Sequence, residues 1–243
     1  MKAVILAAGI ASRLRPLTDH TPKCLLEIGG KSLLERAIQG LLANNIRELI
    51  LVTGYLQEQI VTFVQKKFPE LEVKFIHNEK YASTNNIYSL WLVKNSIKEE
   101  NIVLLDSDIL FDPGLVKAVI DSPYPDTLAL NSHPLCEEEM KVIADSTGKV
   151  TEISKTCPPT QAIGESIGIE KISNAYLKLL FQELDQMIVD EKLGNVFYEA
   201  AFQRLIAKGK SFHIVDTSAL FSMELDTQED FQAATEKLPA NLL

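Results

Sequence analysis

Three cations lie close together near the N-terminus, in a stretch that is otherwise poor in bulky side chains. Arg13, Arg15 and Lys23 follow an apolar run and a loop of small residues, 7–9. Small residues let backbone N–H groups approach a phosphate because little side chain stands in the way. Arg offers a planar fork for phosphate oxygens, and Lys a movable point charge. The pattern predicts a polyphosphate-binding loop, although similar turns occur in many folds that bind nothing there.

Carboxylates end two other apolar runs. Asp106 and Asp108 end one near the middle of the chain, and Asp226 ends another near the C-terminus. Mg²⁺, which accompanies triphosphates, prefers one or two carboxylates and keeps several waters. An isolated Asp is more often a turn former. The acids at 229–230 are instead interpreted as first-turn residues of a helix that Thr227 caps.

Amide and hydroxyl side chains crowd residues 78–92. Asn85, Asn86 and Ser89 lie just ahead of and inside the start of a predicted helix. One such residue suffices as a helix cap, so the cluster favours recognition of a base or ribose.

Alternating strands and helices must position these residues. Strands are predicted at 1–6, 48–52, 72–76 and 101–105, with helices from a Ser32 cap to about residue 44 and at 57–67. This order implies parallel pairing with ligands at the carboxyl ends of the strands. Beyond residue 127 a hairpin at 141–153 and a strand at 164–169 predict antiparallel additions that build a second pocket. Helices are expected at 173–191 and 195–208, and strands at 212–215 and 220–225.

Composition excludes several classes of protein. The 243 residues carry a net charge of −9, which argues against a nucleic-acid binder because such a protein needs a basic surface. The three cysteines are widely spaced, which fits a reducing compartment. No apolar run approaches about 20 residues, and no signal-peptide pattern is present, so we expect a cytoplasmic protein without a membrane span.

The string LAAGIASRLRPLTDHTPKCLL closely resembles the signature of nucleotidyltransferases that activate sugar phosphates and phospho-alcohols, LAAG-x-G-[ST]-R-[LM]-x-P-L-T followed by P-K. Ala11 stands where that family usually has glycine, which crowds the loop unless the backbone there has negative φ. The later string N-x-x-Y-x-x-x-NN-x-YSL, starting at Asn78, is similar to bacterial phosphocholine and 2-aminoethylphosphonate cytidylyltransferases.

The resemblance implies a Rossmann-like three-layer α/β/α fold of the α/β class (GT-A-like), with a mixed, mainly parallel sheet and a small antiparallel substrate lobe. It implies a single domain over 1–243, with a nucleotide part at about 1–125 and an acceptor-binding and metal-completing part at about 126–243. The implied reaction transfers CMP from CTP to a small phosphonate or phospho-amino-alcohol and releases pyrophosphate. 2-Aminoethylphosphonate is slightly favoured over phosphocholine and phosphoethanolamine.

Two other functions stay open. One is a sugar-1-phosphate or inositol-1-phosphate nucleotidyltransferase, and the other is a non-catalytic nucleotide-binding regulatory module. A dinucleotide-binding oxidoreductase is disfavoured because no G-x-G-x-x-G follows the first strand. The expected partners are CTP and the acceptor, without nucleic acid or membrane, and a homodimer is left open.

The resemblance also implies roles for individual residues. Lys23 would hold the α-phosphate and Arg13 the departing pyrophosphate, while Asp108 and Asp226 would bind Mg²⁺. The nucleotide-binding residues expected are Leu6, Ala7, Ala8, Gly9, Ser12, Arg13, Asn85, Asn86, Ser89 and Asp106.

The acceptor pocket is expected to use Lys141, Glu165, Tyr198 and Glu199. A quaternary ammonium prefers aromatic faces, whereas carboxylates can accept hydrogen bonds from a primary ammonium. Since the only Trp, Trp91, lies in the nucleotide-side helix, the carboxylates favour an amino-alkyl acceptor. Ordinary surface charge is the alternative interpretation of both glutamates.

Overall fold

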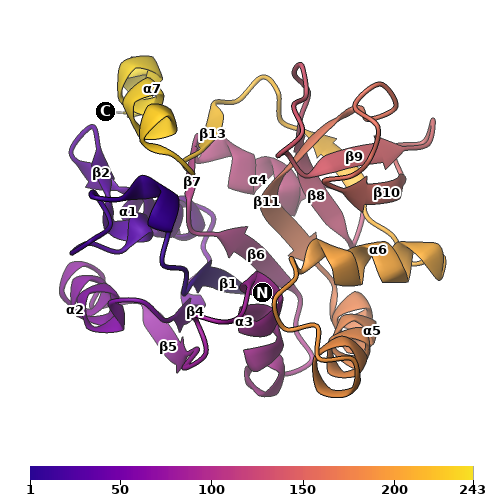
Figure 1. Cartoon of the computed structure of the whole chain (residues 1–243), viewed down its shortest axis with the longest axis horizontal. Helices are drawn as coiled ribbons and strands as arrows, with labels where there is room; N and C mark the ends of the chain where they lie inside the picture. The colour runs from indigo at the N-terminus through magenta and orange to yellow at the C-terminus, as the bar shows by residue number, and fades with distance from the viewer. Residues whose placement is uncertain (243) are drawn as a thin grey trace.

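Four buried parallel strands form the centre of the main sheet. In the computed structural model, which describes residues 1–242, they lie in the order β6-β1-β4-β5, and every adjacent pair is parallel. Their bounds are Lys2–Ala7 for β1, Glu48–Thr53 for β4, Glu72–His77 for β5 and Ile102–Asp106 for β6. The predicted parallel order is therefore confirmed, and the carboxyl ends of β1 and β6 lie side by side (Figure 1).

Further strands, most of them antiparallel to their neighbours, extend this sheet on the β6 side. The long strand β11 (Gly164–Ile172) pairs antiparallel with β6, β8 and β9, and the whole sheet has nine strands. The other strands are β8 (Thr127–Asn131), β9 (Lys141–Ala144), β10 (Val150–Ser154) and β12 (His213–Asp216). The β9–β10 pair is the predicted hairpin. One sheet thus runs through the segments before and after residue 125.

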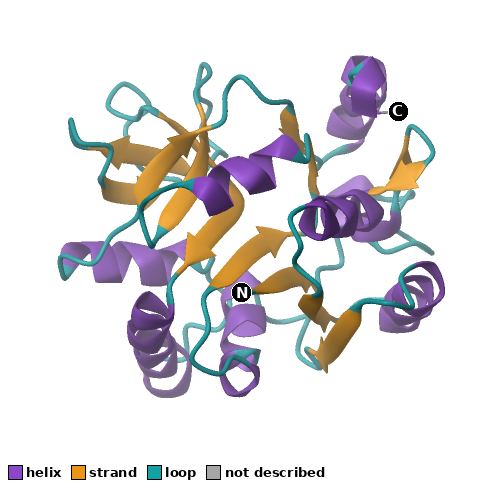
Figure 2. Ribbon diagram, turned by 180° about the vertical axis from the view of Figure 1, so that it is seen from behind, coloured by secondary structure: helices purple, strands orange, loops and turns teal. Residues whose placement is uncertain are grey.

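Helices cover both faces of the sheet, which gives the expected three layers (Figure 2). One face packs on α1 (Leu33–Ala43), α2 (Gln57–Lys67) and α4 (Gly114–Asp121), and the other on α3 (Asn86–Leu92), α5 (Asn174–Asp185) and α6 (Glu199–Ala207). Successive side chains of a strand point to opposite faces. Accordingly Ala3 and Ile5 belong to the first core, while Val4 and Leu6 belong to the second.

The C-terminal stretch returns to the N-terminal part of the chain. β13 (Ser222–Glu224) pairs with β7 (Ile109–Phe111), and α7 (Gln228–Lys237) follows. Figure 1 shows α7 close to the hairpin of β2 (Glu27–Ile28) and β3 (Lys31–Ser32), and Ala234 packs there with Ile28. This return brings Asp226 to the carboxyl ends of the first strands.

Two helix boundaries differ from the sequence prediction. The helix expected at 173–191 ends at Asp185 and continues as a π-helical turn over Gln186–Asp190. The helix expected from 195 begins only at Glu199, and the backbone N–H of the preceding residue, Tyr198, donates to the Asn86 side chain of α3. Short 3₁₀ turns lie at Ser12–Leu14, Lys23–Leu25, Lys94–Ser96 and Ala240–Leu242. Within residues 1–242, no helix combines the length and apolar character that crossing a membrane requires.

Candidate active site

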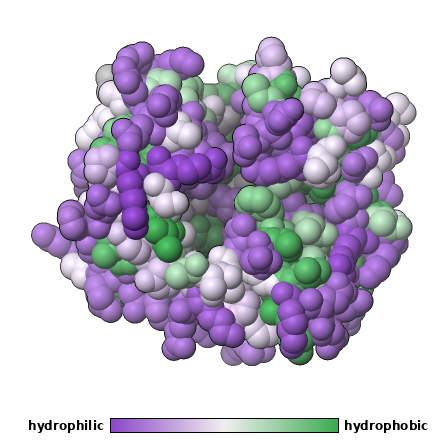
Figure 3. Space-filling model, viewed as in Figure 1, coloured by the Kyte–Doolittle hydropathy of each residue, from purple (hydrophilic) through white to green (hydrophobic). Residues whose placement is uncertain are grey.

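A cavity of about 880 Å³ opens where β1 and β6 end and continues over β11. Figure 3 shows it as a recess in the middle of this face, with hydrophilic side chains above it and a mixture of hydrophilic and hydrophobic ones below. Most of the residues that the sequence singled out line it, from both halves of the chain. They are Leu6, Ala7, Ala8, Gly9, Arg13, Lys23, Asn85, Asn86, Ser89, Asp106, Asp108, Glu165, Glu199 and Asp226. Ser12, Lys141 and Tyr198 do not line it.

The loop after β1 leaves open space beside its backbone. A Cβ on Gly9 would meet no atom within 4 Å. The loop is held from behind by Gly54, where a Cβ would lie 2.5 Å from the Ala8 carbonyl oxygen. Ser12 begins the following 3₁₀ turn and is exposed outside the cavity. The loop therefore exposes main chain to a ligand, as a phosphate-binding loop requires.

Ala11 has φ +52° and ψ +51°. The alternative of a harmless alanine with negative φ is therefore wrong. The left-handed conformation is fixed by two bonds to the Ala11 carbonyl oxygen, from Thr18 Oγ1 at 2.9 Å and from Leu14 N at 3.1 Å. Alanine carries steric strain in this conformation that glycine would not.

Lys23 and Arg13 form ion pairs with the carboxylates predicted to bind metal. Lys23 Nζ donates to Asp108 Oδ2 at 2.8 Å and to Asp226 Oδ1 at 2.7 Å, and Arg13 donates to Asp226. Burial lowers the pKa of Lys23, but the charges of Asp108 and Asp226 outweigh burial and raise it overall. Lys23 therefore carries a positive charge in the cavity at neutral pH.

A third carboxylate joins this cluster. Oxygens of Asp108, Glu224 and Asp226 all lie within 4.8 Å of one another. Burial, followed by the charges of Asp108 and Asp226, raises the pKa of Glu224 to about 8. Three converging carboxylates fit a hard divalent cation such as Mg²⁺, which takes oxygen ligands. Sequence reasoning missed Glu224, yet its spacing of two from Asp226 places both on one side of an extended segment.

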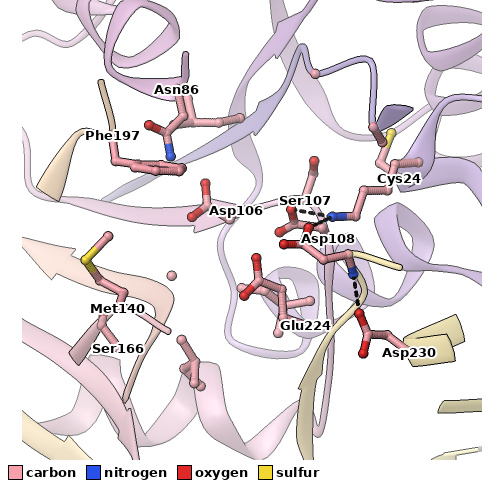
Figure 4. A pocket seen from close by; sticks show the side chains of 18 of the residues that line it. Cys24, Asn86, Asp106, Ser107, Asp108, Met140, Ser166, Phe197, Glu224 and Asp230 are labelled. Carbon is pink, nitrogen blue, oxygen red and sulfur yellow. Dashed lines mark hydrogen bonds and ion pairs between the residues drawn. The ribbon is translucent and has the colours of Figure 1, made fainter. Parts of the chain in front are cut away.

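The nucleoside end of the cavity is built by α3 and the loop before it. Asn85 caps α3 through its own side chain, which accepts from the Asn86 N–H. Ser89 Oγ accepts from Asn78 Nδ2 at 3.1 Å, and the buried Asn78, which the sequence prediction omitted, also lines the cavity. The Asn86 side chain faces the cavity next to Phe197 (Figure 4).

Two acceptor predictions need correction. The Lys141 side chain is buried, and its Nζ donates to the carbonyl oxygens of Glu137, Glu139 and Lys155 at 2.7–3.3 Å. It therefore supports the loop behind the cavity. Tyr198 is also fully buried, and its hydroxyl donates to Asp106 Oδ2 at 3.0 Å from below the cavity floor.

Lys155, and not Lys141, is the lysine found at the acceptor end of the cavity. It lines the cavity, and its Nζ lies 4.6 Å from the centre of the Phe197 ring. Its charge lowers the pKa of Glu165, Glu199 and Asp226, although other causes dominate each shift. A lysine shortly after a predicted hairpin gave no signal strong enough to single it out.

The two predicted acceptor glutamates differ in their surroundings. Glu165 Oε2 lies 3.1 Å from Nε2 of His133, so it already has a partner. Glu199 is buried, and its Oε2 has no hydrogen-bond partner among residues 1–242. Burial raises the pKa of Glu199 to about 7. An unpartnered buried carboxyl oxygen is costly and therefore suits a ligand that donates a hydrogen bond.

Comparisons with known proteins identify the family of this chain. The family model described as "Nucleotidyl transferase" matches residues 2–123. A choline-phosphate cytidylyltransferase of Streptococcus pneumoniae is 33% identical over 82% of this chain and 92% of its own length. A 2-aminoethylphosphonate cytidylyltransferase of Lancefieldella rimae is 30% identical over 95% of this chain and 90% of its own.

Among solved structures, a CTP:phosphocholine cytidylyltransferase from Streptococcus pneumoniae superimposes with a TM-score of 0.81 at 26% identity. The match covers 98% of this chain and 99% of that one. The family match spans half of the chain, and these relatives extend the similarity over nearly all of it. The chain therefore belongs to the nucleotidyl transferase family.

Proposed function

We propose that this protein is a cytidylyltransferase that transfers CMP from CTP to a small amino-alkyl phosphonate or phosphate and releases pyrophosphate. One observation carries the proposal. A single cavity holds the Asn86 amide at one end, Lys23 with three carboxylates in the middle, and the unpartnered Glu199 carboxyl on the side of β11. The names of the relatives support CTP as the nucleotide.

The nucleotide would lie along the carboxyl ends of β1 and β6. Asn86 and Ser89 would contact the base, and the main chain of residues 7–9 would contact the triphosphate. Arg13 would bind the pyrophosphate portion, and Lys23 the α-phosphate. A Mg²⁺ ion held by Asp108, Glu224 and Asp226 would neutralise phosphate charge and orient the triphosphate.

The acceptor would lie over β11. Lys155 takes the place proposed for Lys141, because it is the lysine that lines the cavity there, and it would bind the phosphonate oxygens. Glu199 would accept hydrogen bonds from the amino group. Trp91 packs against α5, with its Nε1 donating to Asp185 Oδ1 at 2.9 Å. Trp91 does not line the cavity, and Phe197 is the aromatic ring at this end. Glu199 offers a carboxyl oxygen that can accept a hydrogen bond from a primary ammonium but not from choline, which has no N–H, and this is why we favour the amino-alkyl acceptor.

The reaction would be a direct in-line transfer. An acceptor oxygen forms a bond to the α-phosphorus, and the bond from that phosphorus to the α–β bridging oxygen breaks, so pyrophosphate leaves with the electron pair. No protein nucleophile is needed because the acceptor is already an anion. Lys23 and Arg13 would hold two mutually repelling anions together and stabilise the charge that develops on the leaving group.

Pyrophosphate release tests the proposal directly. CTP, UTP, dTTP and GTP should each be combined with 2-aminoethylphosphonate, phosphoethanolamine, phosphocholine and glucose-1-phosphate in the presence of Mg²⁺. We expect release with CTP and an amino-alkyl acceptor, and much less with phosphocholine. Release only with a sugar phosphate, or with none of these nucleotide–acceptor pairs, would contradict the proposal.

A further inference from the structure

Tyr198 connects two residues of the nucleoside end of the cavity although it does not line the cavity itself. Its hydroxyl donates to Asp106 Oδ2 at 3.0 Å, and its backbone N–H donates to Asn86 Oδ1 at 3.0 Å. Asp106 ends β6, and Asn86 begins α3. One buried residue in front of α6 therefore fixes side chains from two separate elements.

The bond to Asn86 determines which end of its amide is available to a ligand. A backbone N–H can pair only with the amide oxygen, so the oxygen of Asn86 is engaged and its NH₂ group is left for the cavity. Figure 4 shows the amide nitrogen of Asn86 directed towards Phe197 and the cavity. An NH₂ donor in this place matches the acceptor atoms of a cytosine ring.

Two residues contact the carboxylate of Asp106. The Tyr198 hydroxyl donates to its Oδ2. Gly168, with φ +67°, also packs so closely that a Cβ there would lie 2.6 Å from the same oxygen. Figure 4 shows Asp106 between Asn86 and Asp108. Because the ribose joins the base to the phosphates, Asp106 faces the place where the ribose hydroxyls would lie.

A second buried carboxyl group supports Tyr198 from β11. Glu170 is fully buried, and its two oxygens lie 3.4 Å and 3.5 Å from the Tyr198 hydroxyl oxygen. Burial, and then the charge of Glu199, raises the pKa of Glu170 well above its ordinary value. The Tyr198 hydroxyl has a single proton, and its 3.0 Å distance to Asp106, against at least 3.4 Å to Glu170, directs that proton to Asp106.

We infer that Tyr198, supported by Glu170, is a positioning residue that holds Asp106 towards the ribose of the nucleotide and Asn86 towards its base. The inference rests on the proposed cytidylyltransferase function, which supplies the nucleotide. It places Tyr198 in nucleotide selection, where the sequence had suggested acceptor binding.

The test is discrimination between CTP and its 2′-deoxy and 3′-deoxy analogues, measured as a ratio of kcat/KM values. Tyr198→Phe removes only the hydroxyl, and we expect it to reduce the preference for CTP over at least one analogue by about tenfold. Tyr176→Phe is the matched control, because Tyr176 is buried in α5 and its hydroxyl has no partner within the described chain. It should leave the ratio unchanged. A merely structural defect would lower activity with all three nucleotides equally.

A second pair of variants tests Glu170. Glu170→Gln keeps a hydrogen-bond donor towards Tyr198 and should retain the selectivity, whereas Glu170→Ala should lose it as Tyr198→Phe does. A wild-type ratio in Tyr198→Phe, or an equal loss in Tyr176→Phe, would overturn the inference. If the wild-type enzyme uses another nucleotide, the proposed function fails, and the same ratio with that nucleotide and its deoxy forms still tests Tyr198.

Discussion

The side chain of Lys23 pairs with two carboxylates of the site and is also the cation that we propose takes part in the reaction. Its ammonium group lies between Asp108 and Asp226 and offsets their repulsion, and we propose that it also binds the α-phosphate. We expect Lys23→Met to lower kcat by about 10²–10⁴-fold, because charge developing in the transition state loses its partner. Arg15→Met is the control, since Arg15 does not line the cavity and its ion pair within residues 1–242 is with Asp19 on the surface. A Lys23→Met enzyme with near-wild-type kcat would remove Lys23 from the reaction.

If Glu199 binds the amino group, use of the acceptor should depend on pH. Its raised pKa, about 7 because of burial, means that the carboxylate that attracts an ammonium group forms only as the pH rises through 7. We therefore expect kcat/KM for an amino-alkyl acceptor to increase about tenfold per pH unit below 7 and to level off above it. The acceptor's own phosphonate also titrates, so Glu199→Gln must be measured in parallel. Identical profiles of kcat/KM against pH for the wild-type and Glu199→Gln enzymes would contradict the proposed role of Glu199.

Among the elements, the turn after β1 carries strain at Ala11. A left-handed conformation costs a non-glycine residue roughly 1–2 kcal/mol, whereas glycine adds roughly 0.4–1 kcal/mol of unfolded-state entropy. Ala11→Gly should therefore raise the free energy of unfolding by up to about 1 kcal/mol, and Tm by about 2–4 °C per kcal/mol. Ala233→Gly, inside α7, should change stability in the opposite direction. The measurement is the Tm of both variants relative to the wild-type protein. A lower Tm for Ala11→Gly would show that the substitution relieves no strain.

The elements also show why the sequence predicted some features and not others. Hydrophobic periodicity, the Ser32 cap and the buried strands depend on neighbours in the chain, so α1, α2 and β4 were located to within a residue or two. The errors concern contacts between distant residues. Lys141 was expected in the cavity, but three carbonyl groups hold its Nζ, and no local pattern indicates such a cage. Lys155 was missed because only the folded sheet places it beside Glu199, whereas the spacing of Glu224 from Asp226 was a signal that the sequence interpretation did not use.

In the whole molecule, residues near the N-terminus contact residues near the C-terminus at the cavity. Asp226 pairs with Lys23, 203 positions away in the sequence, and the side chain of Gln228 donates to the Arg15 carbonyl oxygen. The carboxylates proposed to hold Mg²⁺ come from both parts of the chain, Asp108 from the end of β6 and Glu224 with Asp226 from the stretch around β13. A ligand bound here would therefore stabilise contacts between both ends of the molecule.

Thermal unfolding should report this link between the ends. A ligand at about 100 times its Kd stabilises the folded state by about 2.7 kcal/mol, which for a chain of this size corresponds to a rise in Tm of about 5–10 °C. We expect that rise with CTP and Mg²⁺ together, and a much smaller one with CTP and a chelator, since the cations alone then hold the triphosphate. Asp226→Asn should lose the part of the Tm rise that depends on Mg²⁺. Asp216→Asn should keep it, because Asp216 is exposed on β12. An equal rise with and without Mg²⁺ would show that Asp108, Glu224 and Asp226 do not bind the metal, and that their convergence serves only to hold Lys23 and Arg13.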